Sequence, residues 1–531
     1  MPVFADLIRG AVSSHGDAIA VVDQRTGQQL TFRDVDDRFN RLANALQSRG
    51  LGSGDHAAIL QRNSHHWVVS EGALAKLGVA SVPINTFLSA SEIAWVVNHS
   101  EAKALIFDAE YADTVGAIRQ EIPGCELFIC VPEPATAAVP DWALPLQELL
   151  DSGSPADPAA MISPDQPYCI AYTSATTGLP KGVICTNETR VGSVVMSLAN
   201  QLNGLQPSHR LLVTTPLTHV ASGFFWAFFA KGCTSYIMRR YDPVDFCDAI
   251  ASHEITHTFL APTMIISLLA HLDAHESHRA RLSDGTLQAL WYAGSPIPPD
   301  VARRAEDALG PILNQQYGLT ELYGGFPAMA ITHLPARWHR QKAGSCGRPI
   351  VGSVIRVVDD DGAPVAAGSP GEVMIQTMSQ VAGYWNKPAS VAGAYENGWI
   401  RTGDVGRFDD DGFLYIHDRK NDMIISGALN VYPAEVEGAL LAHDAVAGCA
   451  VVGMPHETWV EVPCAVVVRN PGFEGVTEDD LIEFARTRIA HYKVPKRVVF
   501  VESIPTSSAG KILRRKIRDN LSVLVSSDDR A

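Results

Sequence analysis

Residues 172–183, with the sequence YTSATTGLPKGV, combine hydroxyl-bearing, small and cationic side chains in one short segment. Hydroxyls, backbone amides and an ammonium group are the donors with which loops bind phosphate. The candidate ligands are Thr173, Ser174, Thr176, Thr177, Gly178 and Lys181. Pro180 lies between the glycine and the lysine, so the segment is not a Walker loop. Taken alone, it suits a plain turn rich in Ser and Thr as well as a phosphate site.

The elements around this loop predict its position. The preceding run YCIAYTS, residues 168–174, has the length and apolar character of a buried strand, so the loop should follow the carboxyl end of that strand. Earlier, short apolar runs alternate with segments of helical periodicity, such as residues 35–46. This alternation predicts an α/β fold with open, mostly parallel sheets that are covered by helices and bind ligands at the carboxyl ends of their strands.

Composition narrows the classes of partner. A chain of 531 residues is too long for one core and should form at least two domains. Its 42 basic and 58 acidic residues give a net charge of -16, which disfavours nucleic acid and anionic lipid as partners. Nine scattered cysteines without a C-x-x-C pair indicate a reducing cytoplasm, and no apolar segment is long enough to span a membrane.

Further segments with chemistry-bearing residues follow the loop in a fixed order. They are PLTHVASG (216–223), YAGSP (292–296), QQYGLTE (315–321), WIRTGDVGRFDDDGFLYIHDRKNDMI (399–424), SGALNVYPAEVE (426–437) and SSAGKILRR (507–515). With these motifs the chain resembles, over nearly its whole length, the adenylate-forming enzymes: acyl-CoA synthetases, luciferases and peptide-synthetase adenylation domains. The resemblance implies a ligase that uses ATP and Mg²⁺ to convert a carboxylic acid to an acyl-adenylate and then transfers the acyl group to an acceptor.

Two composition changes suggest how the chain divides. Segment 151–167 is rich in Pro, Ser, Asp and Ala, which predicts a surface connection before a new unit. Near residue 415 a strand leads through a charged DRKND stretch into another strand and a helix. Together with the resemblance, this predicts a domain of residues 1–418 that binds ATP and the acid and includes a β-barrel-like subdomain. A small, mobile α+β domain, residues 419–531, should carry the catalytic lysine.

The resemblance assigns that lysine to Lys511, which would bridge the substrate carboxylate and the α-phosphate. Two unit charges about 4 Å apart repel by about 4 kcal/mol at an effective dielectric constant of about 20. A positioned cation between the two anions is therefore needed.

The other roles also come from the resemblance. Asp404 would accept hydrogen bonds from the ribose hydroxyls, and Arg419 would reach the ribose and phosphates. Tyr317 would lie along the adenine, Thr320 would donate to the α-phosphate, and Glu321 would bind Mg²⁺, a cation that prefers oxygen ligands. Further nucleotide contacts are expected from Gly294, Ser295, Pro296, Gln316 and Gly318.

His219 corresponds to the histidine that lines the acid pocket in the family. The aromatic residues 224–226 that follow it suit either a pocket wall or ordinary core. The aromatic character of this segment suggests a hydrophobic or aromatic acid.

CoA is the expected acceptor, but two departures from the family pattern favour an alternative. Ala428 and Val460 replace the usual glycines where pantetheine would pass, which suits an amine acceptor, as in relatives of coronafacate ligase. A carrier-protein thiol, an NTPase that needs no acid and a non-catalytic binding protein are the remaining alternatives.

Two smaller predictions concern local structure. The family usually has glycine at Ala175, and because a methyl group at positive φ costs about 1 kcal/mol or more, we expect φ to be negative there. Residues 253–257, HEITH, match a zinc-protease motif, but no third ligand occurs at a usual offset and the resemblance places a strand there. We therefore reject zinc binding by this motif.

Overall fold

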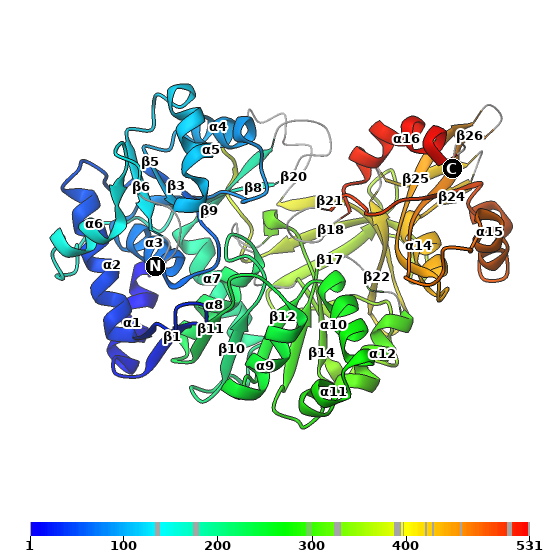
Figure 1. Cartoon of the computed structure of the whole chain (residues 1–531), viewed down its shortest axis with the longest axis horizontal. Helices are drawn as coiled ribbons and strands as arrows, with labels where there is room; N and C mark the ends of the chain where they lie inside the picture. The colour runs from blue at the N-terminus through cyan, green and yellow to red at the C-terminus, as the bar shows by residue number, and fades with distance from the viewer. Residues whose placement is uncertain are drawn as a thin grey trace.

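Two large sheets of mostly parallel strands, each covered by helices, form most of the molecule (Figure 1). The computed structural model describes residues 2–132, 139–173, 180–294, 297, 299–322, 331–386, 395–396, 398–419, 422–426, 429–456, 459–506 and 512–528. Within these ranges, no helix combines the length and the apolar composition needed to cross a membrane. The predicted α/β class is therefore confirmed in both of its large sheets.

The first sheet has eight strands in the order β19-β9-β8-β4-β3-β5-β6-β7, and β3 to β8 pair in parallel. Its strands are β3 (His56–Leu60), β4 (Ala80–Pro83), β5 (Ala104–Asp108), β6 (Leu127–Val131), β7 (Leu144–Pro145), β8 (Pro167–Thr173), β9 (Lys181–Thr186) and β19 (Gly383–Tyr384). The intervening helices are α3 (His65–Leu77), α4 (Ala90–His99), α5 (Ala112–Ile118) and α6 (Leu146–Ser152).

The second sheet has nine strands in the order β16-β15-β14-β13-β12-β10-β11-β1-β2. They are β1 (Ile19–Asp23), β2 (Gln29–Thr31), β10 (Arg210–Val213), β11 (Thr234–Ile237), β12 (His257–Leu260), β13 (Ala289–Tyr292), β14 (Leu313–Tyr317), β15 (Thr332–Leu334) and β16 (Arg348–Pro349). The helices of this part of the chain are α1 (Phe4–His15), α2 (Phe32–Gln47), α7 (Asn187–Ala199), α8 (Val220–Ala230), α9 (Pro243–His253), α10 (Pro262–Ala274), α11 (Glu276–Leu282), α12 (Pro299–Leu309) and α13 (Ala336–His339).

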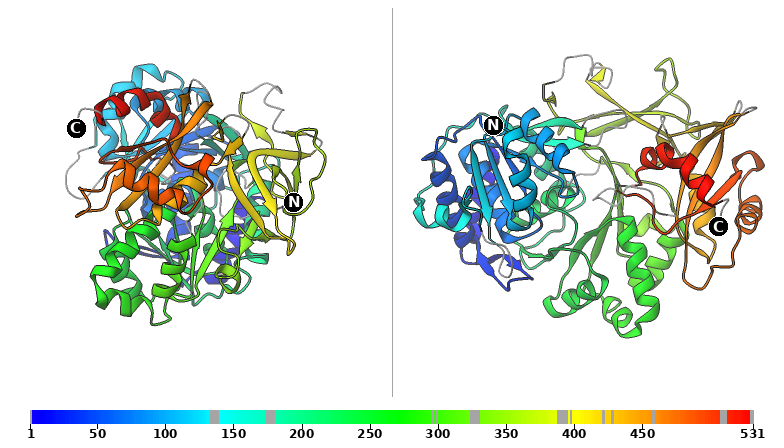
Figure 2. Two further views of the ribbon diagram at one scale, coloured as in Figure 1. Left: turned by 90° about the vertical axis from the view of Figure 1, so that its right-hand side faces the viewer. Right: turned by 45° about the horizontal axis from the view of Figure 1, so that its top comes forward.

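Two smaller sheets complete the fold. An antiparallel half-barrel contains β17 (Ser353–Val358), β18 (Gly371–Thr377), β20 (Tyr395–Glu396), β21 (Trp399–Phe408) and β22 (Leu414–Arg419). The C-terminal sheet contains β23 (Ile424–Ser426), β24 (Leu429–Val431), β25 (Val446–His456), β26 (Val460–Arg469) and β27 (Arg497–Phe500), with helices α14 (Pro433–Leu441), α15 (Glu478–Arg486) and α16 (Arg514–Asp528). Figure 2 shows this sheet and its helices gathered at one end of the molecule, as a small α+β unit should be.

The link between the half-barrel and the C-terminal sheet is short. The Asp418 carboxylate, at the end of β22, accepts a 3.1 Å hydrogen bond from the amide of Ala434 in the first turn of α14. The ring of His417 stacks on Tyr432, with 5.3 Å between ring centroids. The predicted domain boundary after residue 418 falls at this point and stays a prediction.

One apolar core is shared by the two large sheets. Helix α8 contributes Phe225 and Trp226, which are fully buried, and Trp226 packs against Phe4 of α1 and Phe39 of α2. Gly72 in α3 allows this packing, because a Cβ atom there would lie 2.3 Å from the Phe39 ring. Phe225 and Trp226 are thus core residues.

A buried charge lies inside this core. The Glu71 carboxylate on α3 accepts hydrogen bonds from Tyr168 Oη at 2.6 Å and from Trp226 Nε1 at 2.9 Å. The fully buried Arg190 donates to Ser222 Oγ at 3.0 Å, and Ser222 Oγ lies 3.3 Å from Glu71. Burial raises the pKa of Glu71, whereas the Arg190 charge lowers it. The network fixes α3, α7, α8 and β8 to one another.

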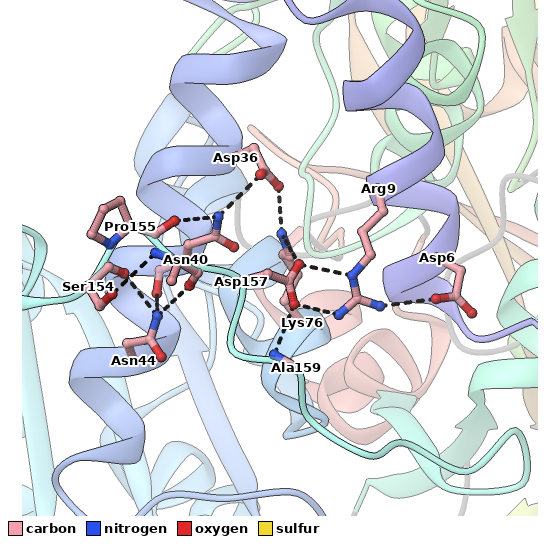
Figure 3. Close-up of polar contacts among 11 residues, drawn as sticks. Asp6, Arg9, Asp36, Asn40, Asn44, Lys76, Ser154, Pro155, Asp157 and Ala159 are labelled. Carbon is pink, nitrogen blue, oxygen red and sulfur yellow. Dashed lines mark hydrogen bonds and ion pairs between the residues drawn. The ribbon is translucent and has the colours of Figure 1, made fainter.

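Segment 151–167 is fastened to the helices around it (Figure 3). Asp157 accepts two 2.9 Å hydrogen bonds from Arg9 and lies 2.9 Å from the ammonium group of Lys76, which is 1% exposed. The side chains of Asn40 and Asn44 on α2 donate to backbone carbonyls of residues 154–156. The segment is a surface connection, as predicted, but it doesn't precede a new unit. Strand β8 pairs in parallel with β4 in the sheet already begun.

Candidate functional site

The phosphate-binding candidate of the sequence is a connection between two strands. Thr173 ends β8 and pairs with Lys181, the first residue of β9, across an antiparallel hairpin. The preceding strand is thus confirmed, and a strand rather than a helix follows, which agrees with the absence of a Walker motif. Ser174, Ala175, Thr176, Thr177 and Gly178 lie outside the described residues, so the predicted φ of Ala175 stays a prediction.

The carboxyl ends of β13 and β14 meet at one edge of the second sheet, since these strands pair in parallel. Gly294 follows β13 with φ of +96°, a left-handed conformation that favours glycine. Tyr317 is the last residue of β14, and Gly318 follows it. Gln316 is buried and points to the opposite face from Tyr317, as neighbours on a strand do. Ser295 and Pro296 lie outside the described residues.

The half-barrel brings a carboxylate to this edge. Tyr317 Oη donates a 2.5 Å hydrogen bond to Oδ2 of Asp404 on β21, a residue that is 4% exposed. Burial and the neighbouring Asp404 charge raise the pKa of Tyr317 well above its ordinary value, so the phenol keeps its proton. The backbone of Arg419 on β22 pairs with Asp404, whereas its side chain lies outside the described residues. A carboxylate held in this way can accept hydrogen bonds from sugar hydroxyls.

A second carboxylate lies next to the cation of the loop. Thr320 and Glu321 form a 3₁₀ turn after β14. Glu321 Oε1 accepts a 2.9 Å hydrogen bond from Tyr384 Oη, and the Lys181 ammonium lies 5.5 Å from the centroid of the same tyrosine ring. Tyr384 therefore joins a carboxylate of the second sheet to the cation of the first. An oxygen ligand suited to Mg²⁺ and a cation suited to phosphate stand on either side of it.

Tyr384 is absent from the sequence-based candidates. It belongs to β19, a strand of two residues that pairs with Val183 and Ile184 on β9. So short a strand has no periodicity that could be detected. The signal in the sequence was the local string GYW, residues 383–385, whose aromatic pair follows a glycine.

The predicted acid-pocket residue His219 stands at the N-terminus of α8. It is half-buried, and its Nδ1 lies 3.0 Å from Thr218 Oγ1. Phe224, in the second turn of α8, contacts Phe259 and Trp291 and is buried in the same core cluster as Trp226. Phe224 is therefore part of the core, as Phe225 and Trp226 are.

The catalytic candidate Lys511 and the acceptor-side residue Ala428 lie outside the described residues, as does the side chain of Val460. The described residues nearest to Lys511 in sequence are Thr506 and Ile512, which pair in an isolated antiparallel bridge. Helix α16 begins two residues after this bridge, at Arg514.

The HEITH segment is not a zinc-protease helix. Helix α9 ends at His253, Glu254 adopts a left-handed conformation with φ of 48°, and His257 begins β12. The two histidines therefore do not share a helical face, which confirms that this motif was rightly rejected.

The donor set fits ATP with Mg²⁺ on chemical grounds. It holds one carboxylate for ribose hydroxyls, a second for a hard cation, and an ammonium group beside a hydroxyl-rich loop.

Comparison with known proteins identifies relatives along the whole chain. The sequence profile of a family described as AMP-binding enzyme matches residues 8–385, and that of the AMP-binding enzyme C-terminal domain matches residues 435–511. The chain is 35% identical, over 514 residues, to the long-chain-fatty-acid–CoA ligase FadD13 of Mycobacterium tuberculosis, which covers 95% of this chain and 96% of the relative.

Two solved structures share the fold. O-succinylbenzoate CoA synthetase (MenE) of Bacillus subtilis, in complex with the acyl-adenylate intermediate OSB-AMP, superposes with a TM-score of 0.84 at 28% identity and covers 98% of this chain and 99% of its own. Amide bond synthetase McbA of Marinactinospora thermotolerans superposes with a TM-score of 0.83 at 28% identity, covering 97% and 99%.

Proposed function

The chain belongs to the family of AMP-binding enzymes, and from this premise we propose that it is an AMP-forming carboxylic acid ligase whose acceptor is CoA. The observation that carries the proposal is the convergence of Asp404, Glu321 and Lys181, through two tyrosine contacts, at the strand ends where the family motifs predict the nucleotide.

In the first step, a carboxylate oxygen of the acid attacks the α-phosphorus of ATP. The new C–O–P anhydride forms as the bond to pyrophosphate breaks, which gives the acyl-adenylate. Asp404 accepts hydrogen bonds from the ribose and orients the nucleotide, while Lys181 contacts the phosphates beside it. When bound, Mg²⁺ would neutralise phosphate charge, and Glu321 is the residue proposed to hold it.

Lys511 is proposed to lie between the two reacting anions in this step. Its place in the SSAGKILRR motif supports the role. The proposal includes a domain boundary after residue 418 and rotation of the C-terminal sheet about it. In the second step, the acceptor thiol gives up its proton, its sulfur attacks the acyl carbon, and AMP leaves. His219 is proposed to line the acid pocket. Thr320, directly before Glu321, is proposed to donate to the α-phosphate.

The acid is proposed to be hydrophobic or aromatic. The apolar segment at the start of α8, with Phe224 facing Phe259, supports this class. A relative with 33% identity, from Amycolatopsis, is named feruloyl-CoA synthase, and the FadD13 relative is named for a long-chain fatty acid.

A second candidate acceptor is an amine, which would give an amide instead of a thioester. The observations that favour it are the Ala428 and Val460 substitutions in the acceptor-side motifs and the similarity to an amide bond synthetase. We also propose a cytoplasmic location, because none of the nine cysteines, each buried and among the described residues, forms a disulfide.

The test is acid-dependent exchange of pyrophosphate into ATP, followed by mass spectrometry of products formed with CoA and mixed amines present together. Exchange and a thioester are expected. The Lys511→Ala variant should lose exchange but still transfer the acyl group from a pre-made adenylate. An amide product would establish the second candidate. ATP hydrolysis without acid, or no exchange with any acid tried, would refute a ligase.

A further inference from the structure

Three helices that cover the second sheet bring thiol and imidazole groups together. Helices α9, α10 and α11 contact one another and lie side by side in the lower half of Figure 1. Cys247 belongs to α9, His271 to the last turn of α10, and His278 to α11. One ligand atom from each of the three residues lies within 4.8 Å of the other two.

The spacings of the three ligand atoms, from 2.7 Å up to at most 4.8 Å, bracket those of a tetrahedral metal site. Zinc bonds of about 2.0–2.1 Å to nitrogen and 2.3 Å to sulfur place neighbouring ligand atoms roughly 3.3–3.6 Å apart. His271 Nε2 and His278 Nδ1 already lie 2.7 Å apart and share a hydrogen bond. A metal ion would replace that shared proton, and the two imidazoles would separate by less than about 1 Å to admit it.

The surroundings of His278 suit a metal ligand. Its Nδ1 faces His271, and its Nε2 lies 3.5 Å from a carboxylate oxygen of Asp248 on α9. A metal-bound histidine usually donates its second ring N–H to a carboxylate, which fixes the tautomer and the ring orientation. The ring of His271 is also supported, because it stacks on His275 with 4.1 Å between centroids and 17° between planes. Both imidazoles are thus oriented before any ion binds.

We propose that Cys247, His271 and His278 bind a zinc ion that joins α9, α10 and α11, with a water molecule as fourth ligand. One thiolate with two imidazoles is a borderline-soft donor set that suits Zn²⁺ rather than Mg²⁺ or Ca²⁺. The thiol is available because Cys247 is a free cysteine, fully buried between the helices. The site is separate from the rejected HEITH motif, whose histidines contribute nothing to it.

The three ligands come from three different helices, so the expected consequence is structural. An ion that binds the folded chain but not the unfolded chain raises the free energy of unfolding. The increase grows with the logarithm of the ion concentration divided by the dissociation constant. Micromolar zinc should therefore raise the melting temperature of the chelator-treated protein, whether or not a nucleotide is present. A failed ligase assay would not change the expected rise in melting temperature with zinc. A failure to bind zinc would likewise not bear on the ligase activity.

The experiment uses the full chain, first stripped with a chelator and then titrated with Co²⁺ and Zn²⁺. One ion per chain should bind, and Co²⁺ should give a near-ultraviolet thiolate charge-transfer band together with the strong visible bands of a four-coordinate site. Cys247→Ser should abolish the charge-transfer band, and His278→Gln should weaken zinc binding at least tenfold. Asp248→Asn should weaken zinc binding by about 10- to 100-fold, as loss of an outer-shell carboxylate does.

His253→Gln is the matched control, because this histidine lies on α9 outside the cluster and stacks on Tyr236. It should leave the cobalt spectrum and the zinc affinity unchanged. Circular dichroism checks that each variant is folded. The proposal is overturned if the folded wild-type protein binds less than one ion per chain, if the cobalt spectrum lacks a thiolate band, or if the Cys247→Ser and His278→Gln variants bind zinc as the wild type does.

Discussion

The contact between Tyr384 and Glu321 gives a prediction with a calculable size. Tyr384→Phe removes one 2.9 Å hydrogen bond to a carboxylate and keeps the aromatic ring beside Lys181. A hydrogen bond to a charged group is worth about 1.5–3 kcal/mol, but half-buried Glu321 can take up water in its place, so about 1–2 kcal/mol should be lost. This corresponds to roughly a 5- to 30-fold fall in kcat/KM for adenylation.

The assay is pyrophosphate exchange measured over a range of Mg²⁺ concentrations. If Tyr384 acts by orienting Glu321, the variant should need more Mg²⁺ for half-maximal exchange, while the KM for the acid stays constant. Tyr384→Leu, which also removes the ring, should lose a further 0.5–1 kcal/mol, about two- to fivefold, through the missing cation–π contact.

Tyr415→Phe serves as the matched control. Tyr415 Oη lies 3.4 Å from the Asp409 carboxylate in the half-barrel, so the same atom is removed beside another carboxylate. Its exchange rate should equal that of the wild type. Tyr384 does not orient Glu321 if the exchange rate of Tyr384→Phe stays within about twofold of the wild type, or if only the KM for the acid rises.

Two stability predictions concern the buried charges. Asp157→Asn should lower the free energy of unfolding by about 1–2 kcal/mol, since Lys76 loses one of its carboxylate partners. Hydrogen bonding from Arg9 lowers the pKa of Asp157 below its ordinary value. Ionised Asp157 therefore stabilises the folded chain above about pH 4. As the pH falls below that value, the difference in unfolding free energy between wild type and variant, measured with urea, should shrink. Glu71→Ala should lower the free energy of unfolding by about 3–5 kcal/mol, because the charge of Arg190 stays buried without its counterion; a urea midpoint equal to that of the wild type would contradict this.

Local patterns in the sequence predicted elements well and neighbours poorly. The helical periodicity of residues 35–46 falls within α2, and the run 168–174 is β8 almost residue for residue. Such patterns arise because one face of the element is buried, and the spacing of apolar residues that reports this burial lies within a single segment. The partner of β8 is β4, which ends about eighty residues earlier in the chain, so segment 151–167 was wrongly taken to precede a new unit.

The site shows the same division. Asp404, Tyr317 and Glu321 stand in recognisable motifs, and the described geometry brings the first two together and links the third to Lys181 through Tyr384. Tyr384 lies more than sixty residues from its partner along the chain and in a strand of two residues, and no spacing rule connects them. Only the folded structure shows that Tyr384 contacts Glu321.

The first turn of α14 is completed by another sheet. The amide of Ala434 finds its acceptor on Asp418 of the half-barrel, not on a capping residue of its own segment. In the rotation proposed above, turning the C-terminal strands away from β22 would break this hydrogen bond and leave the Ala434 amide to water. This single hydrogen bond would therefore favour the arrangement described here over the rotated one.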